Sequence, residues 1–427
     1  MENTQIERDK TNVIDIEVFN RTLIITSFFI YFVIRPIDKF LMIHYKIIPN
    51  INFTLLIIVM LGIYITINII INWRNLIKIQ FKPSMIAGAC IIGALAIITI
   101  INAPRALEYA SIGQYVNTIA DVTIQGIFFF IIGINYRYLV KPSEKARKIM
   151  YIGYIIFVAT VLWGVAINPD KTVFFVHMAG EKSYFTLSDS MAIYSFLILV
   201  LCRRNISKIV VAIMSTACLY ATLSRTSLYL FVGIAILYFI TKFKNFKQVI
   251  AVGCILSVLG GVGIFYVAYK GGLHLTNSRM VNLIFNKEKD QSYLSRQEIL
   301  KEGKEDIKNN LLTGKLLVEV ERGKPGKYIH NILSYLQQYG IIVFVLFIGL
   351  VAYCGLKTII LLVKDWRDEE VLFLASLILY TFVAVIFSRA YNYVYIWMSI
   401  GICLEMDVIR GQKELKSNDG ISVSSDL

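Results

Sequence analysis

Long apolar runs recur along almost the whole of this 427-residue chain. Each run has about 16–24 residues, which as an α-helix is long enough, or nearly so, to cross the ~30 Å hydrocarbon core of a bilayer. Hydrophobic residues make up 57% of the sequence, and the mean hydropathy is +0.65. Soluble domains hold about 45–50% apolar residues even when glycine is counted. The sequence therefore predicts an all-α, polytopic membrane protein.

The runs predict about twelve transmembrane helices. At two places, the polar segment that separates consecutive predicted helices is short. A helix of about 35 residues over 207–241 would exceed the bilayer, so we predict a tight outer turn at Ser224-Arg225-Thr226. The same pattern appears from Ser388 to Asn392. The predicted spans are 22–34, 52–72, 84–101, 115–135, 149–167, 186–202, 207–223, 226–241, 248–269, 341–363, 371–387 and 392–407.

The distribution of Lys and Arg predicts the orientation. With the N-terminus in the cytoplasm, inner segments carry about 22 of these residues and short outer loops about 8, which agrees with the positive-inside rule. Both termini are then cytoplasmic, and the one long polar segment faces outside. This gives four regions: a transmembrane bundle over 1–269, an extracytoplasmic loop over 270–340, C-terminal helices over 341–409 and a disordered cytoplasmic tail over 410–427.

Several classes of protein are disfavoured. The net charge of +14 is explained by cytoplasmic Lys and Arg, and no basic domain outside the membrane favours nucleic-acid binding. The first 17 residues lack the basic, apolar and small-residue regions of a cleaved signal peptide. The six cysteines lie in or beside apolar runs and form no CxxC site. We find no Walker-type loop, HExxH motif, outer Asp-x-Asp or nucleophile elbow, and so predict neither a metal nor a cofactor.

The outer loop contains a predicted amphipathic helix from Ser295 to Asn309, with Ser295 and Glu298 as a capping box. The loop closes at His330-Asn331. A neutral imidazole accepts a proton near physiological pH, and a neighbouring Asn can orient a ligand or the loop. The alternative is an ordinary surface His beside a loop Asn. Apolar residues from Ile332 to Tyr339 follow at helical spacing and predict a helix on the outer membrane surface.

Arg225 is a candidate ligand for an anion. An arginine within an apolar run costs at least about 2.5–3.5 kcal/mol at the bilayer centre, so it should face water or a partner. Its side chain would line an outward-facing cavity, or alternatively snorkel from a helix end to the interface. Arg389 has the same two interpretations.

These features resemble the O-antigen ligase and polymerase (Wzy/WaaL-like) superfamily of bacterial envelope proteins. The resemblance rests on Ser224-Arg225-Thr226 at a span junction, Arg296 in a large outer loop, Asn310-Leu311-Leu312-Thr313-Gly314, and His330-Asn331 followed by Leu333, Leu336 and Gly340. The Gly-x-Gly pattern often found after the loop helix is absent, because Lys315-Leu316 follow Gly314.

The resemblance implies a GT-C-like, metal-independent, inverting glycosyltransferase in the bacterial cytoplasmic membrane, with its active site outside. Its substrate would be an oligosaccharide linked to undecaprenyl pyrophosphate. Arg225 and Arg296 would hold the donor diphosphate, and His330 would be the general base. Asn331 would orient His330 or the sugar. Arg279, Arg389 and Tyr339 would be further substrate-binding residues.

Polymerase and ligase share such a site. A polymerase transfers a growing chain to another lipid-linked repeat, whereas a ligase transfers it to another acceptor, such as lipid A core. The Ile-, Lys- and Asn-rich composition resembles low-GC bacteria, many of which lack lipid A, and this favours the polymerase. A flippase of lipid-linked oligosaccharide is the rival class, but it predicts internal symmetry and short outer loops. A flippase and a chain-length regulator are expected partners, together with the bilayer.

Overall fold

The computed structural model describes residues 17–38, 41, 53–72, 83–167, 183–222, 224–242 and 291–418, and within these ranges every regular element is a helix. The first is Glu17–Asp38, which contains the π-helical segment η1 (Ile30–Ile34). The others are α3 (Phe53–Asn72), α4 (Pro83–Ile101), α5 (Ala103–Ala106), α6 (Ile112–Ile119), η2 (Ala120–Ile124), α7 (Gln125–Ile134), α8 (Arg137–Val140), α9 (Glu144–Ile167), α10 (Ser183–Leu201), α11 (Asn205–Ala221), α12 (Arg225–Lys242), α15 (Gln291–Asn309), α16 (Val318–Glu321), α17 (Leu333–Asp365), α18 (Glu369–Phe387) and α19 (Tyr395–Asn418).

A helix lies at each predicted span except 248–269, which falls outside the described residues. Six described helices are long and apolar enough to cross a membrane, and shorter apolar helices occupy the other predicted ranges. The chain is therefore a multi-pass membrane protein, and the total of twelve spans stays a prediction. A break between two helices lies next to Ser224 as predicted, but Arg225 and Thr226 belong to α12, because α11 ends at Ala221 and α12 begins at Arg225. The turn predicted after Ser388 separates α18 from α19.

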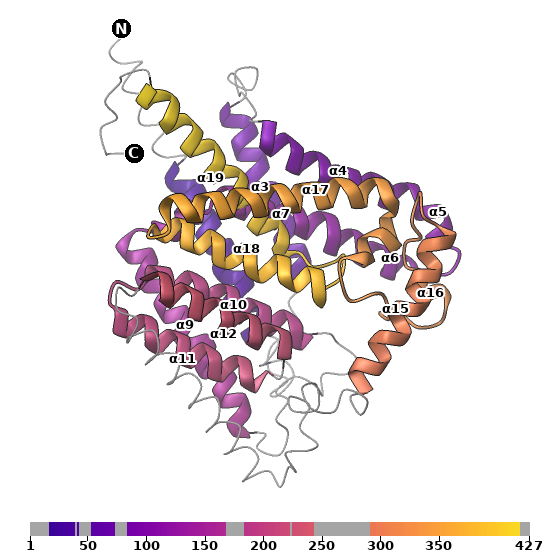
Figure 1. Ribbon diagram of the computed structural model, residues 1–427, viewed down its shortest axis with the longest axis horizontal. Helices are drawn as coiled ribbons and strands as arrows, with labels where there is room; N and C mark the ends of the chain where they lie inside the picture. Colours follow the sequence, from indigo (N-terminus) through magenta and orange to yellow (C-terminus); the bar gives the residue numbers. More distant parts are fainter. Residues whose placement is uncertain are drawn as a thin grey trace.

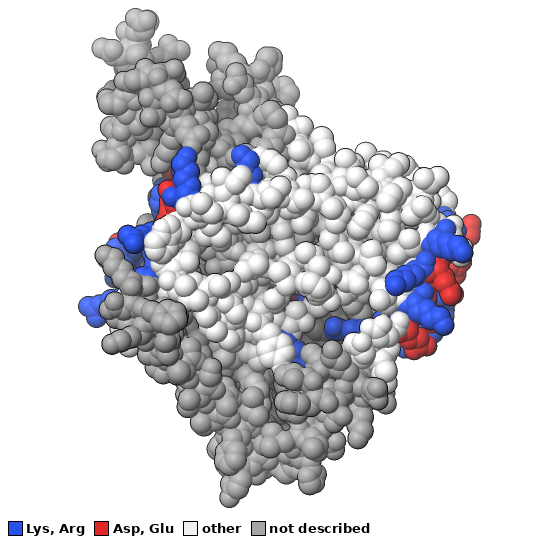
Figure 2. Space-filling model, viewed as in Figure 1, with Lys and Arg blue, Asp and Glu red and all other residues white. Residues whose placement is uncertain are grey.

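The surface of the bundle has an apolar band between two charged ends. In the view of Figure 2, most Lys, Arg, Asp and Glu side chains gather at two opposite margins, with uncharged surface between them. Many large apolar side chains of the described residues are exposed, including Ile155, Ile342, Leu356 and Val363. Such side chains are stable in lipid, because burying them against acyl chains removes apolar area from water.

One end of the bundle is held by ion pairs among helix termini. Glu369, at the start of α18, pairs with Lys208 of α11 at 2.9 Å and with Lys242 of α12 at 2.5 Å. The next residue, Glu370, pairs with Lys141 after α8. These cations belong to the segments that the positive-inside rule assigns to the cytoplasm.

The loop segment over 291–332, predicted to face outside, packs at the opposite end of the bundle (Figure 1). Figure 1 shows α15 and α16 beside α5, beyond the ends of the long helices. The capping box predicted at Ser295 is wrong, because α15 begins at Gln291 and Ser295 is already inside the helix. The loop is also joined to the α4–α6 connection. Arg105 donates to Asn310 at 3.1 Å, and Tyr109 donates to the Leu316 carbonyl at 2.5 Å.

The helix predicted to lie on the membrane surface after His330 is instead enclosed by protein. Every residue from Ser334 to Gly340 is buried, and the ring of Tyr335 stacks on Phe347 at 4.0 Å between centroids. The amphipathic spacing was read correctly as a helix. However, spacing alone does not distinguish a face that packs on lipid from one that packs on protein.

Candidate active site

The segment Asn310–Gly314 and the end of the short helix before Gly340 form one compact unit. The backbone N–H of Ile341 donates to the Leu311 carbonyl at 2.9 Å. The N–H of Lys315 donates to the Gln337 carbonyl at 2.9 Å. Two motifs that are far apart in the sequence are therefore paired through their backbones.

This pairing requires glycine at both positions where the backbones meet. Gly314 has φ +67° and Gly340 has φ +77°, a region in which other residues are strained. A Cβ atom on Gly340 would lie 2.1 Å from the Leu312 carbonyl oxygen, and one on Gly314 would lie 2.5 Å from the Gln338 carbonyl carbon. Gly340 also interrupts α17, so the chain changes direction there before it enters the membrane.

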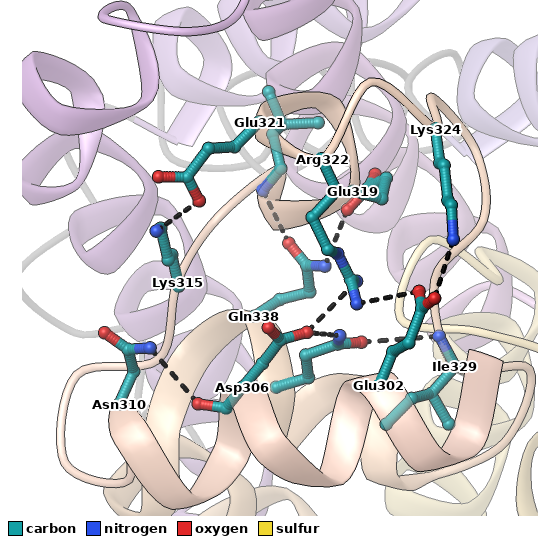
Figure 3. A network of polar contacts seen from close by, with 12 residues as sticks. Glu302, Asp306, Asn310, Lys315, Glu319, Glu321, Arg322, Lys324, Ile329 and Gln338 are labelled. Carbon is teal, nitrogen blue, oxygen red and sulfur yellow. Dashed lines mark hydrogen bonds and ion pairs between the residues drawn. The ribbon is translucent and has the colours of Figure 1, made fainter. Parts of the chain in front are cut away.

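Two adjacent glutamines hold the rest of the loop to this unit. The Gln337 amide donates to the Asp306 carboxylate at 2.7 Å and accepts from the Ile329 N–H at 3.3 Å. The Gln338 amide accepts from the Leu317 N–H at 2.8 Å and donates to Glu319 at 3.2 Å. Figure 3 shows Gln338 beneath α16 and Asp306 on α15. These glutamines were not among the predicted site residues. Their only signal was an amide pair within an otherwise apolar helix turn.

Charged residues close the outer side of the loop. Glu302 of α15 pairs with Lys324 at 2.6 Å and with Arg322 at 3.1 Å, and Arg322 also pairs with Asp306 at 3.0 Å (Figure 3). The hydrogen bond from Lys324 lowers the pKa of Glu302 below its usual value. The Glu302 carboxylate therefore stays charged to a lower pH than an isolated Glu, and this network ties α15 to the 322–324 turn.

His330 is the residue after Ile329, whose N–H is bound by Gln337, and it is partly exposed to solvent. Its ring lies 5.3 Å from the ring of Tyr328, and Tyr328 in turn lies 5.3 Å from Tyr391 of the α18–α19 turn. The side chain of Asn331 accepts a hydrogen bond from the Leu333 N–H at 2.9 Å. Asn331 thus orients the loop at the start of the following helix, one of the roles that an Asn at this position can have.

Tyr339 lies behind His330 and not at the surface. Its exposed fraction is 0%, and its ring lies 5.9 Å from that of Tyr391. The side-chain amide of Asn392 also donates a hydrogen bond to the Tyr328 hydroxyl at 3.2 Å. Tyr339, Tyr391 and Tyr328 therefore form a row of ring contacts, called the aromatic wall here, that ends at His330.

Arg225 is the first residue of α12, and its side chain is partly buried. The serines on either side of it are fixed, since the hydroxyls of Ser224 and Ser227 lie 2.7 Å apart and both are buried. Arg225, a candidate site residue, therefore lies in a first helical turn that is held by the hydrogen bond between these two serines.

Arg296 lies on the face of α15 that packs against the His330 segment. The spacing from Arg296 to Ile299 and Gly303 keeps all three on one side of the helix. Ile299 is 7% exposed, and a Cβ on Gly303 would lie 2.4 Å from the side chain of Ile329. Seven residues of helix place Arg296 about 10 Å along the axis from this contact. Arg279 lies outside the described residues.

Arg389 is buried in a separate polar cluster. Its guanidinium donates twice to the carboxylate of Asp189, through Nε and Nη2, each at 2.8 Å. Nη2 also donates to Ser227 at 2.9 Å. The Tyr380 hydroxyl adds a bond to Asp189 at 2.6 Å. The structure thus joins Arg389 to the turn that carries Arg225, and the sequence analysis did not single out Asp189.

In the described ranges, no group of three or more His, Cys, Asp or Glu side chains is arranged to hold a metal ion. The candidate residues that the structure describes are instead a partly exposed imidazole, His330, and two partly buried guanidiniums, Arg225 and Arg296. Guanidiniums bind phosphate oxygens in a bidentate manner, and an imidazole moves protons, so the arrangement suits transfer chemistry on an anionic substrate.

Residues 209–348 match a family model described as O-antigen ligase. This match supports the O-antigen ligase and polymerase superfamily. Neither the search of curated proteins nor that of solved structures found a match. The matched stretch begins within α11, contains α12, α15 and α16, and ends within α17.

The matched region contains Arg225, Arg296 and His330. The superfamily resemblance is therefore confirmed over the region whose motifs carried it. Members of the O-antigen ligase family are glycosyltransferase-like membrane enzymes that use lipid-linked oligosaccharides. Asp189, Arg389 and Tyr391 lie outside the matched domain but contact it, through Ser227 and Tyr328.

Proposed function

We propose that this protein is a polysaccharide polymerase on the outer face of the bacterial cytoplasmic membrane. It would transfer a glycan from undecaprenyl pyrophosphate to a sugar hydroxyl of another lipid-linked repeat unit. The observation that carries this proposal is the O-antigen ligase match over a domain that holds Arg225, Arg296 and His330. The loop also gives His330 partial exposure on a scaffold fixed by paired backbones.

In this proposal the arginines act on the leaving group. The bond between the anomeric carbon and the diphosphate oxygen breaks, and undecaprenyl diphosphate leaves with both bonding electrons. Arg225 and Arg296 hold the diphosphate and stabilise the charge that develops on it, with Arg279 as a further member of the basic cavity. Arg389, predicted for the same cavity, is instead buried and committed to Asp189. Cations that bind this charge most strongly in the transition state lower the barrier.

His330 acts on the acceptor. Its neutral imidazole takes the proton of the attacking hydroxyl while that oxygen bonds to the anomeric carbon from the side opposite the diphosphate. The anomeric configuration is therefore inverted, and no metal ion is required. Asn331 fixes the loop that carries His330, and Tyr339 supports the aromatic wall behind it. General base catalysis of this kind typically contributes 10²–10⁴-fold.

The site faces outside if the basic end of the bundle faces the cytoplasm. The cations of the Glu369 and Glu370 ion pairs lie at the end opposite to the loop, which supports this orientation. A glycan already carried across the membrane by a flippase would then be the substrate.

The second candidate is a ligase, which moves the glycan to an acceptor other than a lipid-linked repeat. The family match covers both activities. The low-GC type of composition is the observation that favours the polymerase. A flippase is less favoured, because the chain matches a transferase family and has one large loop instead of a repeated helical unit.

The test supplies purified protein with lipid-linked repeat units, without ATP and with a chelator of divalent metals, and separates the products on a gel. A polymerase forms a ladder of lipid-linked chains and releases undecaprenyl diphosphate. Transfer to an added non-repeat acceptor without a ladder would support the ligase. Movement of the lipid across vesicle membranes with no covalent product would contradict both transferase functions.

A further inference from the structure

Asp189 is a carboxylate enclosed by protein within the bundle. It lies near the start of α10, and its exposed fraction is 1%. A buried carboxylate is stable only when it is paired and hydrogen-bonded. Donors from Arg389, Tyr380 and Ser227 reach it at 2.6–2.8 Å. Its two oxygens therefore receive four hydrogen bonds from three other parts of the fold.

The partners of Asp189 lie next to the proposed active-site residues. Ser227 is two residues after Arg225 and in the same first turn of α12. Arg389 is two residues before Tyr391, whose ring contacts Tyr328 beside His330. The carboxylate thus fixes both the helix end that carries Arg225 and the turn that supports the His330 segment.

A second ion pair in the same bundle, between the buried Lys208 and the partly exposed Glu369, has no such neighbours. Lys208, 3% exposed, pairs with Glu369 at 2.9 Å, and Tyr238 also donates to Glu369. This cluster joins α11, α12 and α18 at the end opposite the loop. It stabilises the bundle as Asp189 does, but it is remote from every proposed site residue. It is therefore a matched control for the general effect of breaking an ion pair.

We propose that Asp189 is a positioning residue: through Arg389, Ser227 and Tyr380 it holds Arg225 and the His330 segment in the relative geometry that transfer requires. This inference rests on the proposed function for its kinetic consequences, but its structural consequences can be measured without activity. Positioning errors of about 1 Å far from the reacting atoms can cost about 100-fold in rate.

The first test compares Asp189→Asn with the control Glu369→Gln by hydrogen exchange of the full-length protein in detergent. Asp189→Asn is expected to speed exchange in peptides containing Ser224–Ser227 and Ser388–Val394. Glu369→Gln should speed exchange only at the ends of α11, α12 and α18 near Lys208. Unchanged exchange in the two Asp189 segments would overturn the proposal.

The second test measures the rate of glycan transfer per folded protein. Asp189→Asn should lower kcat about 100-fold, with KM for the lipid-linked donor changed less. Arg389→Lys keeps the charge but loses the planar fork, and should lower kcat in the same direction. Glu369→Gln should stay within about threefold, because distant sites act independently. Full transfer by Asp189→Asn would overturn the proposal, even with faster exchange.

A double variant separates positioning from simple stability. Asp189→Asn with Arg389→Gln leaves no uncompensated buried charge, so it should regain folded protein relative to Asp189→Asn alone. It should not regain kcat. Recovery of both would show that the pair serves only stability. If the wild-type protein transfers no glycan at all, the proposed function fails, and the exchange comparison still decides whether Asp189 fixes the two segments.

Discussion

Gly340 meets the carbonyl oxygen of Leu312 so closely that a Cβ atom on Gly340 would lie 2.1 Å from that oxygen. The contact joins the last residue of the His330 motif to the Asn310–Gly314 motif. Gly340 and Gly314, which ends the Asn310–Gly314 motif, both have positive φ. The two motifs are therefore parts of one backbone interface, and their spacing in the sequence reflects the loop that must fold between them.

Gly340→Ala is expected to detach this interface. Gly340 has φ 77° and ψ 179°, a region that costs a residue with a Cβ about 1–3 kcal/mol, and the overlap with Leu312 adds to this cost. We expect a lower unfolding midpoint in detergent and faster hydrogen exchange over 310–316.

Gly349→Ala is the matched control for this change. Gly349 lies later in α17, is exposed, and has no atom within 4 Å of a built Cβ. Replacing a helical glycine by alanine gains up to about 1 kcal/mol. An equal or higher midpoint is therefore expected. If both variants lowered the midpoint equally, the close backbone contact at Gly340 would have no specific role in stability.

Gln337→Leu should loosen the segment that carries His330. Gln337 is 1% exposed and satisfies both Asp306 and the Ile329 N–H. Leaving a buried polar group without its partner costs about 1–3 kcal/mol. Exchange of the 328–332 peptide should accelerate roughly tenfold or more, since 1.4 kcal/mol is a factor of ten. Gln297→Leu, at an exposed position on α15, is the control and should leave this peptide unchanged.

Arg296→Ala should slow transfer by about 10²–10³-fold if its guanidinium stabilises the leaving diphosphate. Lys301→Ala removes a positive charge from the same helix, but Lys301 is exposed and lies on another face. It should keep a rate close to that of the wild type. The measurement is release of undecaprenyl diphosphate from a lipid-linked repeat. Equal losses in both variants would indicate a general effect of charge and not a site at Arg296.

The membrane helices could be predicted because lipid leaves the backbone few alternatives. An apolar segment in a bilayer must satisfy its own hydrogen bonds, and a helix does this within one segment. The turns at Ser224 and Ser388 were predictable for the same reason, since a polar break in an apolar run marks a helix end. Arg225 and His330 stood out because polar residues are rare in such sequence.

The missed features depend on contacts between distant segments. Asp189 lies within a predicted span, and nothing in its own stretch indicates that Arg389, 200 residues later, pairs with it. Gln337 and Gln338 are ordinary helix residues until the loop folds over them. The start of α15 was misplaced because Ser295 and Glu298 have capping-box spacing, although the helix already begins at Gln291.

The most direct measurement of the central claim is chain growth by purified protein carrying His330→Gln. Glutamine keeps a polar side chain at this position but cannot accept the proton. With wild-type protein forming a ladder from lipid-linked repeats, the variant is expected to slow chain growth by 10²–10⁴-fold. The exposed neighbour Lys327→Ala, as the control, should retain the ladder. A full ladder from His330→Gln at the wild-type rate would contradict the role of His330 as general base.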